Sequence, residues 1–249
     1  MTYKDYVKWH RMPTTWCPGC AIGTVFKQLT FVLADLAIPR EELVVVSGIG
    51  CSGRAAGYFN VDSIHATHGR AIAVAEGVKR ANDRLKVIVF SGDGDLAGIG
   101  GNHLLHSSRR DVDLTVVCIN NAIYGMTGGQ LAPTTPKGTK TLTSPFGSAY
   151  QPVNIQGIVT ANRRHWYARG SAYQILHLQK LLREAIEWKG FSFVEVMSFC
   201  VENLGRRLGY QNGYEMLFKV KQDYKTVGKP EGPLKENELG VMKDDGQAS

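Results

Sequence analysis

Apolar residues follow two patterns along this chain of 249 residues, and the two patterns alternate. Short continuous runs rich in valine and isoleucine are typical of strands that are buried on both faces of a parallel sheet. Longer stretches with apolar residues three or four positions apart predict helices that bury one face. The alternation predicts an α/β fold with a mainly parallel sheet flanked by helices.

The predicted elements follow one another in a regular order. Strands are predicted over residues 43–47, 86–90, 114–119 and 191–199, and helices over residues 22–36, 71–82, 99–107 and 173–188. The sequence contains no internal repeat and no heptad array. A chain of this length can form one α/β domain with a substantial core, and we assign residues 1–228 to that domain.

Two stretches of the sequence have neither pattern. Residues 124–150 are rich in Gly, Thr and Pro and begin just after a predicted strand, which favours a loop that covers a cofactor. Residues 229–249 are polar and contain Pro230 and Pro233. This composition predicts a C-terminal tail that is mobile or draped on a partner.

The composition argues against several classes of protein. Hydrophobic residues make up 43% and charged residues 20%, as in ordinary globular proteins, and no apolar stretch approaches the ~20 residues that span a bilayer. Residues 1–11 lack the apolar core of a signal peptide, so we expect a cytoplasmic protein. The net charge of +7 is spread over scattered basic pairs without a nucleic-acid motif. It therefore suits anionic substrates or acidic protein partners better than nucleic acid.

Polar residues follow two of the predicted strands at their carboxyl ends. The strand at 86–90 leads into Gly-Asp-Gly-Asp (residues 92–95), and the strand at 114–119 leads into Asn-Asn-Ala-Ile-Tyr (residues 120–124). Open α/β sheets bind ligands beyond these strand ends, so one carboxylate and one amide would face the same ligand. Mg²⁺ prefers oxygen ligands, of which few come from protein and several from phosphate. The pair of motifs predicts a Mg²⁺–diphosphate site, whereas the Gly-Asp turn alone would be an ordinary strand ending.

The spacing of these two motifs resembles the thiamine diphosphate motif of enzymes that use this cofactor. The resemblance implies that the side chains of Asp93 and Asn121 coordinate Mg²⁺ and that the carbonyl oxygen of Ile123 completes the protein ligands. It further implies that a set of residues around the two motifs contacts the cofactor, namely Gly92, Gly94, Asp95, Gly125, Met126 and Thr127.

Five cysteines in a chain expected in the cytoplasm indicate metal or redox chemistry rather than disulfides. Cys118 lies within a predicted strand and is interpreted as a small buried hydrophobe. The other four are Cys17, Cys20, Cys51 and Cys200, and their spacing alone leaves open a redox dithiol, a zinc site or an iron–sulfur cluster. A neighbouring thiamine diphosphate favours a [4Fe–4S] cluster, because decarboxylation of a 2-oxo acid leaves an electron-rich intermediate and zinc cannot accept electrons.

Taken together, the motifs resemble those of the beta subunit of 2-oxoacid:ferredoxin oxidoreductases. The matching segments extend from the N-terminus to Cys200 and are residues 16–20, 48–52, 65–70, 92–95, 120–124 and 124–130. The resemblance implies a three-layer thiamine diphosphate-binding fold. One departure is visible, because Ala21 follows the second cysteine where a glycine is frequent in the family. A methyl group at this position leaves the thiolates in place.

The resemblance also implies roles for individual residues. All four cysteines outside the predicted strands would bind a [4Fe–4S] cluster, and further contacts to the cofactor would come from Ile49, Gly50, Cys51, Ser52 and His68. His68 and Arg70 open the predicted helix 71–82 toward the site and are our candidate catalytic residues. His68 could equally cap the helix, and Arg54 could either meet a substrate carboxylate or remain solvated.

By the same resemblance, the reaction is the oxidative decarboxylation of a 2-oxo acid, with coenzyme A accepting the acyl group and ferredoxin the electrons. Residues 200–209 look like the corresponding region of 2-oxoglutarate-type members, which implies succinyl-CoA and CO₂ as products. Pyruvate or a branched-chain 2-oxo acid is the alternative substrate, and a non-catalytic iron–sulfur or zinc module is the alternative function. The carboxylate that activates the cofactor's pyrimidine has no candidate in this chain. The family therefore implies an obligate alpha subunit, and additional small subunits are compatible with it.

Overall fold

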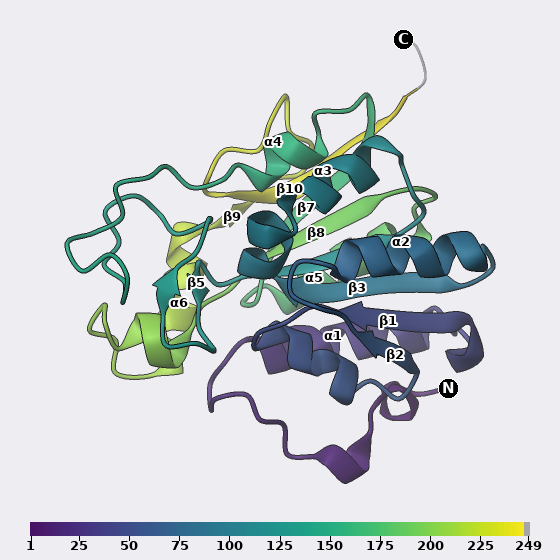
Figure 1. Cartoon of the computed structure of the whole chain (residues 1–249), viewed down its shortest axis with the longest axis horizontal. Coiled ribbons are helices and arrows are strands. Elements are labelled where there is room, and N and C mark those ends of the chain that lie inside the picture. The colour runs from purple at the N-terminus through teal and green to yellow at the C-terminus, as the bar shows by residue number, and fades with distance from the viewer. Residues whose placement is uncertain (247–249) are drawn as a thin grey trace.

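The computed structural model describes residues 1–246, and an eight-stranded sheet forms its centre (Figure 1). All neighbouring strands are parallel except β7 and β10. In spatial order the strands are β2 (Asp62–His65), β1 (Leu43–Ser47), β3 (Lys86–Gly92), β4 (Thr115–Asn120), β8 (Ser192–Met197), β7 (Arg164–Ser171), β10 (Glu238–Asp245) and β9 (Lys225–Thr226). The predicted α/β fold is confirmed, and the four predicted strands are β1, β3, β4 and β8.

Helices and shorter helical turns connect the strands. The helices are α1 (Ile22–Asp35), α2 (Ala71–Ala81), α3 (Gly101–Arg109), α4 (Ile155–Val159), α5 (Ile175–Glu187) and α6 (Gly213–Asp223). The turns are η1 (Tyr3–Tyr6), η2 (Trp9–Arg11), η3 (Arg40–Glu42), η4 (Ser52–Gly57), η5 (Gly94–Ile99) and η6 (Val201–Gly205). A small hairpin, β5 (Ile123–Tyr124) with β6 (Gln130–Leu131), follows β4. None of the helices in residues 1–246 has the length and apolar character needed to cross a membrane.

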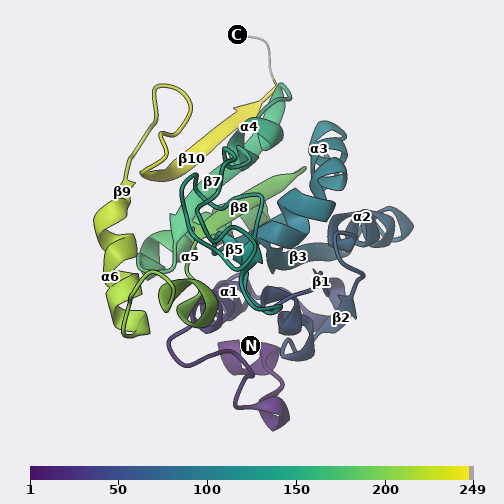
Figure 2. The ribbon, with the colours of Figure 1, turned by 60° about the vertical axis from the view of Figure 1, so that its left-hand side comes forward.

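Three layers result from the two-residue alternation of side chains along the strands. On β3, Ile88 and Phe90 face the layer of α1 and α5, whereas Val87 and Val89 face α2, α3 and α4 (Figure 2). All four side chains are essentially inaccessible to solvent. Burial on both faces explains why the central strands have no polar positions between the apolar ones.

The half of the sheet beyond β8 was not predicted, because its strands carry many charged residues. The prediction of a mobile polar tail after residue 228 is wrong for β10, which pairs antiparallel with β7 from Gly240 opposite Arg169 to Asp245 opposite Arg164. Leu239 is completely buried in this strand. Charged residues are common on strands near a sheet edge, where one face or one end meets solvent, so composition alone did not reveal the strand.

The sheet register sets the position of the two polar motifs. Gly92 at the end of β3 pairs with Ile119 near the end of β4, so Asp93 and the asparagine pair leave the sheet side by side. The long segment that follows, residues 125–154, lies beyond these strand ends on the left of Figure 1. Thr134 and Thr135 of this segment are buried, because the segment folds back over the strand ends.

Candidate cofactor site

Three oxygen atoms from the two strand ends converge on one point. The side-chain oxygen Oδ1 of Asn121 lies 2.8 Å from the carbonyl oxygen of Ile123 and 3.2 Å from Oδ1 of Asp93. Neighbouring ligands in an octahedral Mg²⁺ site with bonds of 2.0–2.1 Å are about 2.9 Å apart, so these separations suit one shared ion. If the Asn121 amide were reversed, its NH₂ group would donate to the same two oxygens. A cation bound between the oxygens would favour the orientation in which Oδ1 faces them.

Asp93 is held by donors from two directions. The backbone N–H of Asn121 donates to its Oδ1 at 3.4 Å, and the hydroxyl of Thr134 donates to its Oδ2. Burial raises the pKa of Asp93 to about 6, because the carboxylate is removed from water. Sequence reasoning missed Thr134. The only available signal was the Thr-Thr-Pro run within the loop that was expected to cover the cofactor.

A tight turn presents the other two oxygens. Ala122 has a φ of +57°, which is unusual for a residue with a side chain, and its N–H donates to Oδ1 of Asn120 at 3.2 Å. Thr135 donates its hydroxyl to the carbonyl oxygen of Ala122 at 2.7 Å. This turn directs the side chain of Asn121 and the carbonyl oxygen of Ile123 toward Asp93.

A small cavity of about 50 Å³ lies at these oxygens. With the exception of Tyr124, every lining residue was predicted to contact the cofactor or the metals; the lining consists of Ile49, Gly50, Cys51, Ser52, Gly92, Asp93, Gly94, Asp95, Asn121, Ile123, Tyr124, Gly125 and Met126. The hydroxyl of Tyr124 donates to the carbonyl oxygen of Gly94 at 3.0 Å, and a Cβ on Gly94 would lie 2.3 Å from the Tyr124 ring. Only glycine permits this approach of η5 to the hairpin.

Asp95 lines the cavity, but its carboxylate oxygens already accept hydrogen bonds from protein groups. Its Oδ1 accepts hydrogen bonds from the backbone N–H groups of Ile49 at 3.1 Å and Gly69 at 2.8 Å. Ser91 donates its hydroxyl to Oδ2 at 2.9 Å. Asp95 therefore joins the ends of β1 and β3 to the segment before α2, and contact with a diphosphate would fall to neighbouring backbone.

The two candidate catalytic residues lie in different surroundings. Nδ1 of His68 lies 2.7 Å from Oδ1 of Asp95, and the His68 ring lies 6.1 Å from the ring of Tyr124. His68 thus borders the cavity from behind Asp95 without lining it. Arg70 is exposed and places Nη1 2.9 Å from Nε2 of His103 on α3. The structure does not bring Arg70 to the cavity.

Thr127 is also outside the cavity. Its hydroxyl donates to Oε1 of Gln130 at 2.5 Å, and the residue is exposed at the tip of the β5–β6 hairpin. The predicted contact of Thr127 with the cofactor stays a prediction.

Four thiols from three segments of the chain gather beside the cavity. Cys51 follows β1, Cys200 follows β8, and Cys17 and Cys20 lie on the N-terminal arm. A Cβ on Gly125 would lie 3.1 Å from Sγ of Cys200 and 4.0 Å from Sγ of Cys51. Gly125, which lines the cavity together with Cys51, therefore lies between Cys200 and the oxygen site.

Hydrogen bonds hold the thiol-bearing segments together. The indole N–H of Trp16 donates to the carbonyl oxygen of Cys51 at 2.8 Å, which ties the arm to β1. The backbone N–H of Asn203 donates to Sγ of Cys200 at 3.4 Å, and its side-chain amide donates to the carbonyl oxygen of Gly125 at 2.6 Å. These contacts link all three segments around Gly125.

Three of the four thiols have a raised pKa in this arrangement. Burial raises the pKa of Cys17, of Cys51 and, to about 11, of Cys20, and the neighbouring thiols act in the same direction. Among residues 1–246, no three His, Cys, Asp or Glu side chains have the geometry of a metal site. The donor set fits an iron–sulfur cluster in kind, because four thiols lie close enough to influence one another's pKa and Sγ of Cys200 already accepts a backbone N–H. Cys118 is fully buried in β4, which confirms its interpretation as a small hydrophobe.

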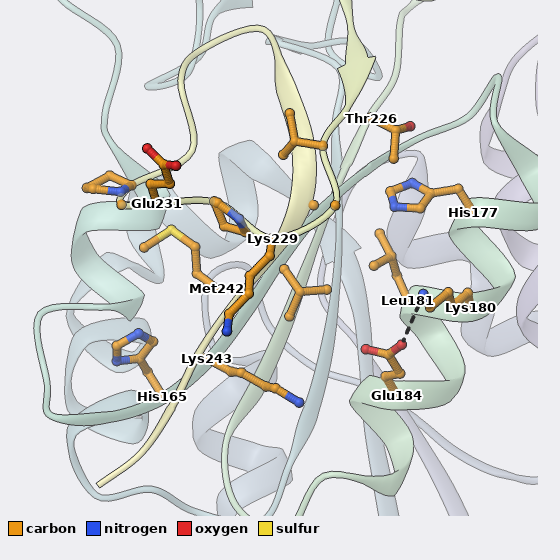
Figure 3. A pocket seen from close by; sticks show the side chains of 17 residues that line it. His165, His177, Lys180, Leu181, Glu184, Thr226, Lys229, Glu231, Met242 and Lys243 are labelled. Carbon is orange, nitrogen blue, oxygen red and sulfur yellow. Dashed lines mark ion pairs between the residues drawn. The ribbon is translucent and has the colours of Figure 1, made fainter. Parts of the chain in front are cut away.

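A larger cavity, of about 680 Å³, lies elsewhere, between α5, β10 and the loop from residue 226 to 233 (Figure 3). Its charged residues include Lys180 and Glu184, whose Nζ and Oε1 lie 3.9 Å apart, and Lys243 on β10. None of the predicted site residues lines it. The polar motifs therefore indicate the smaller cavity at the strand ends as the cofactor site.

Comparison with known proteins agrees with this geometry. The family described as "Thiamine pyrophosphate enzyme, C-terminal TPP binding domain" matches residues 48–196, which include both strand-end motifs. The 2-oxoacid:ferredoxin oxidoreductase 2, subunit beta, of Aeropyrum pernix is 42% identical over 185 residues, covering 74% of this chain and 60% of that protein. This chain is a beta subunit of the 2-oxoacid:ferredoxin oxidoreductase family. The resemblance inferred from the motifs is thereby confirmed.

Other members of this beta-subunit family have a more specific name. The 2-oxoglutarate synthase subunit KorB of Archaeoglobus fulgidus is 49% identical over 199 residues, covering 80% of this chain and 74% of that protein. The 2-oxoglutarate:ferredoxin oxidoreductase from Magnetococcus marinus, solved with 2-oxoglutarate, coenzyme A and succinyl-CoA bound, is 29% identical. It aligns with a TM-score of 0.84 over 98% of this beta subunit and 85% of that chain.

Proposed function

We propose that this beta subunit binds thiamine diphosphate through a Mg²⁺ ion held by Asp93, Asn121 and Ile123. Together with an alpha subunit, it would oxidise 2-oxoglutarate to succinyl-CoA and CO₂ and pass the electrons through a [4Fe–4S] cluster to ferredoxin. The observation that carries the proposal is that the side-chain amide of Asn121 lies 3.2 Å from Oδ1 of Asp93 and 2.8 Å from the carbonyl oxygen of Ile123 at the ends of β3 and β4. An ordinary strand ending has no reason to bring a buried carboxylate, an amide and a carbonyl oxygen together at one point.

The chain's own residues have distinct tasks in this proposal. Thiamine diphosphate, when bound, supplies the nucleophilic carbon and the electron sink for decarboxylation. Asp93 and Asn121 anchor the diphosphate end through the ion, and the glycines at positions 92 and 94 allow backbone to approach phosphate oxygens. Asp95 places the His68 ring beside the site, with Nδ1 of His68 2.7 Å from Oδ1 of Asp95.

The four thiols support an electron-transfer role for the same subunit. Cys17, Cys20, Cys51 and Cys200 would hold the cluster as thiolates, and closing the ligand set would release their protons. Cys51 and Gly125 both line the cofactor cavity, and a Cβ on Gly125 would lie 3.1 Å from Sγ of Cys200. The short separation supports direct passage of electrons from the cofactor site to the cluster.

The dimensions of the cavity support a second chain. A volume of about 50 Å³ accommodates an ion and a few phosphate atoms, whereas cofactor pockets usually measure about 300–1,000 Å³. Neither carboxylate of the cavity is free to activate the pyrimidine, because Asp93 would bind the ion and Asp95 accepts hydrogen bonds from protein donors. The covering segment also exposes Phe146, which is 98% accessible, together with Leu142 and Tyr150. An alpha subunit that covers these side chains and supplies the pyrimidine-activating carboxylate would complete the site.

The substrate is proposed from the relatives. The KorB subunits carry the name 2-oxoglutarate synthase at 42–49% identity, and the aligned Magnetococcus marinus enzyme was solved with 2-oxoglutarate and succinyl-CoA. The test is an anaerobic assay of the assembled enzyme with coenzyme A and a viologen acceptor. We expect turnover with 2-oxoglutarate to exceed that with pyruvate and with branched-chain 2-oxo acids. A preference for pyruvate would contradict the proposal that 2-oxoglutarate is the substrate.

Cofactor analysis of the same preparation tests the class of function. The proposal predicts thiamine diphosphate, iron and sulfide, and no turnover by the beta subunit alone. Zinc without thiamine diphosphate would instead indicate a structural metal module. Turnover by the isolated beta subunit would contradict the need for an alpha subunit.

A further inference from the structure

Glu195 is a buried acid that contacts neither the cavity nor the thiols. It lies in the middle of β8 between Val194 and Val196, which are both inaccessible to solvent, and is itself only 4% exposed. A carboxylate in such surroundings costs free energy unless donors satisfy it. Its partners therefore indicate what the acid does.

Donors from both neighbouring strands satisfy the carboxylate. The side-chain amide of Asn120, at the end of β4, donates to Oε1 of Glu195 at 2.7 Å. On β7, the hydroxyl of Tyr167 donates to Oε2, and Nε of Arg169 donates to the same oxygen at 3.2 Å. Burial, with the Glu195 carboxylate beside it, raises the pKa of Tyr167 well above its ordinary value, so the hydroxyl remains a donor.

Asn120 connects this acid to the turn that carries the metal-site oxygens. Because its NH₂ group is bound to Glu195, its Oδ1 must point the other way, where it accepts the N–H of Ala122 at 3.2 Å. That bond holds Ala122 at its φ of +57°. Residues 121 and 123, on either side of Ala122, supply two of the three converging oxygens.

Arg169 connects the same acid to the C-terminal part of the chain. Its Nη1 donates to the carbonyl oxygens of Lys235 at 2.8 Å and Glu238 at 3.4 Å, immediately before and at the start of β10. A continuous series of polar contacts, buried around Glu195, thus runs from the segment before β10, through Arg169, Glu195 and Asn120, to the turn at Ala122.

We propose that Glu195 is a positioning residue for the metal site: it fixes the Asn120 amide so that the turn presents Asn121 and Ile123 to the ion. The proposal rests on the proposed function, because it assumes that Mg²⁺ binds there. Glu195 and Asn120 would not bind the ion themselves. Partners that orient metal ligands typically change metal affinity about 10- to 100-fold when they are lost.

The test measures the Mg²⁺ dependence of thiamine diphosphate binding to the assembled, cofactor-depleted enzyme. Glu195→Gln retains the size of the side chain but has one acceptor oxygen for donors on both sides, so the Asn120 amide loses its fixed orientation. We expect the Mg²⁺ concentration at half-saturation to rise about tenfold in this variant. Binding of the cofactor at saturating Mg²⁺ should change much less.

Two further variants keep the test decisive if Glu195→Gln folds poorly. Tyr167→Phe removes one hydrogen-bond donor to Glu195 without adding a group. We expect a two- to threefold rise in the half-saturating Mg²⁺ concentration, which is about the effect of losing one weak hydrogen bond. Ser192→Ala is the matched control, because the Ser192 hydroxyl is buried 3.3 Å from Oγ1 of Thr115 at the other end of the same strands β8 and β4. It should lower thermal stability and leave the Mg²⁺ dependence unchanged.

The outcomes separate this inference from the proposed function. If wild-type enzyme binds thiamine diphosphate equally well without a divalent ion, the proposed metal site itself fails. If wild-type binding needs Mg²⁺ but Glu195→Gln and Tyr167→Phe behave like Ser192→Ala, Glu195 stabilises the sheet only, and the positioning role is overturned.

Discussion

The oxygen site and the thiol group lie on either side of Gly125, yet they differ in how completely the chain forms them. The three oxygens of Asp93, Asn121 and Ile123 already have the separations of ligands around one small ion. The four thiols lie near one another, but no three acidic, histidine or cysteine side chains in residues 1–246 have metal-site geometry. Under the proposed function, the oxygen site would be formed before its ion arrives, whereas the thiol group would depend on its cluster to close.

The origin of the residues explains this difference. The oxygens come from the ends of two adjacent, hydrogen-bonded strands, and a turn only three residues long supplies two of them. The thiols come from the N-terminal arm and from two segments that follow separate strands. Sheet register fixes positions more tightly than the packing of an arm does, so an ion can act on a preorganised site and a cluster must order its own ligands.

The largest expected effect comes from breaking the oxygen site alone. Asp93→Asn removes the carboxylate charge while keeping the shape, and we expect Mg²⁺-dependent thiamine diphosphate binding by the assembled enzyme to weaken by on the order of 100-fold or more. Isothermal titration with the cofactor measures this. Iron content and the broad iron–sulfur absorbance should stay unchanged, and a parallel loss of iron would show that the two sites are not independent.

Breaking the thiol group alone should have the reverse pattern. Cys200→Ser should lower iron and sulfide to background and abolish electron transfer to a viologen, because one of four cluster ligands is lost. Bound thiamine diphosphate should remain near one per beta subunit. Cys118→Ala is the control, since Cys118 is buried within β4 and should be dispensable for iron binding. An intact cluster in Cys200→Ser would remove this residue from the ligand set.

A substitution between the two sites should disturb both to a smaller degree. Gly125→Ala places a Cβ 3.1 Å from Sγ of Cys200, so the sulfur or the hairpin must shift by a few tenths of an ångström. We expect about a tenfold fall in viologen reduction, with partial loss of iron. Gly101→Ala is the matched control, because a Cβ on Gly101 meets no atom within 4 Å. Equal activity of the two variants would contradict the position given to Gly125.

A separate effect, on stability rather than on binding or turnover, is the pH dependence of the oxygen site without its ion. Burial raises the pKa of Asp93 to about 6 in the folded chain, above its ordinary value of 3.8. The stability contributed by Asp93 is therefore fully present below pH about 4 and is lost as the pH rises through about 6, by on the order of 3 kcal/mol. Asp93→Asn should remove this dependence in thermal unfolding of the cofactor-free enzyme. Saturating Mg²⁺ and thiamine diphosphate should also suppress it, and identical pH profiles for wild type and variant would contradict the assignment.

Much of the fold and the oxygen site could be predicted because the necessary information is local in the sequence. Continuous apolar runs identified the four central strands, and the polar residues that follow β3 and β4 had to meet at one edge of a parallel sheet. This adjacency predicted that one carboxylate and one amide face the same ligand, and the resemblance to the thiamine diphosphate motif identified them as Asp93 and Asn121. The family resemblance added the four cysteines, whose spacing alone left three readings open.

The remaining features depend on contacts between distant segments. Thr134 contacts Asp93 only because the segment of residues 125–154 folds back over the strand ends, and the sequence of that segment does not specify how it folds. Asp95 appeared to be a cofactor contact from its motif, but its oxygens satisfy donors from two other loops. Strand β10 was mistaken for a tail because its charged residues hide the pairing with β7. Side-chain partners across a sheet are set by register, which the sequence pattern does not specify.

The most direct test of the central claim replaces Mg²⁺ with Mn²⁺ in the assembled enzyme and measures its hyperfine couplings by electron–nuclear double resonance. With thiamine diphosphate bound and isoleucine labelled with ¹³C at the carbonyl carbon, we expect coupling to the phosphorus of the diphosphate and to one isoleucine carbonyl, that of Ile123. Both couplings should be absent in Asp93→Asn. Bound Mn²⁺ that couples to phosphorus equally in wild type and Asp93→Asn, with no coupling to an isoleucine carbonyl, would contradict the account.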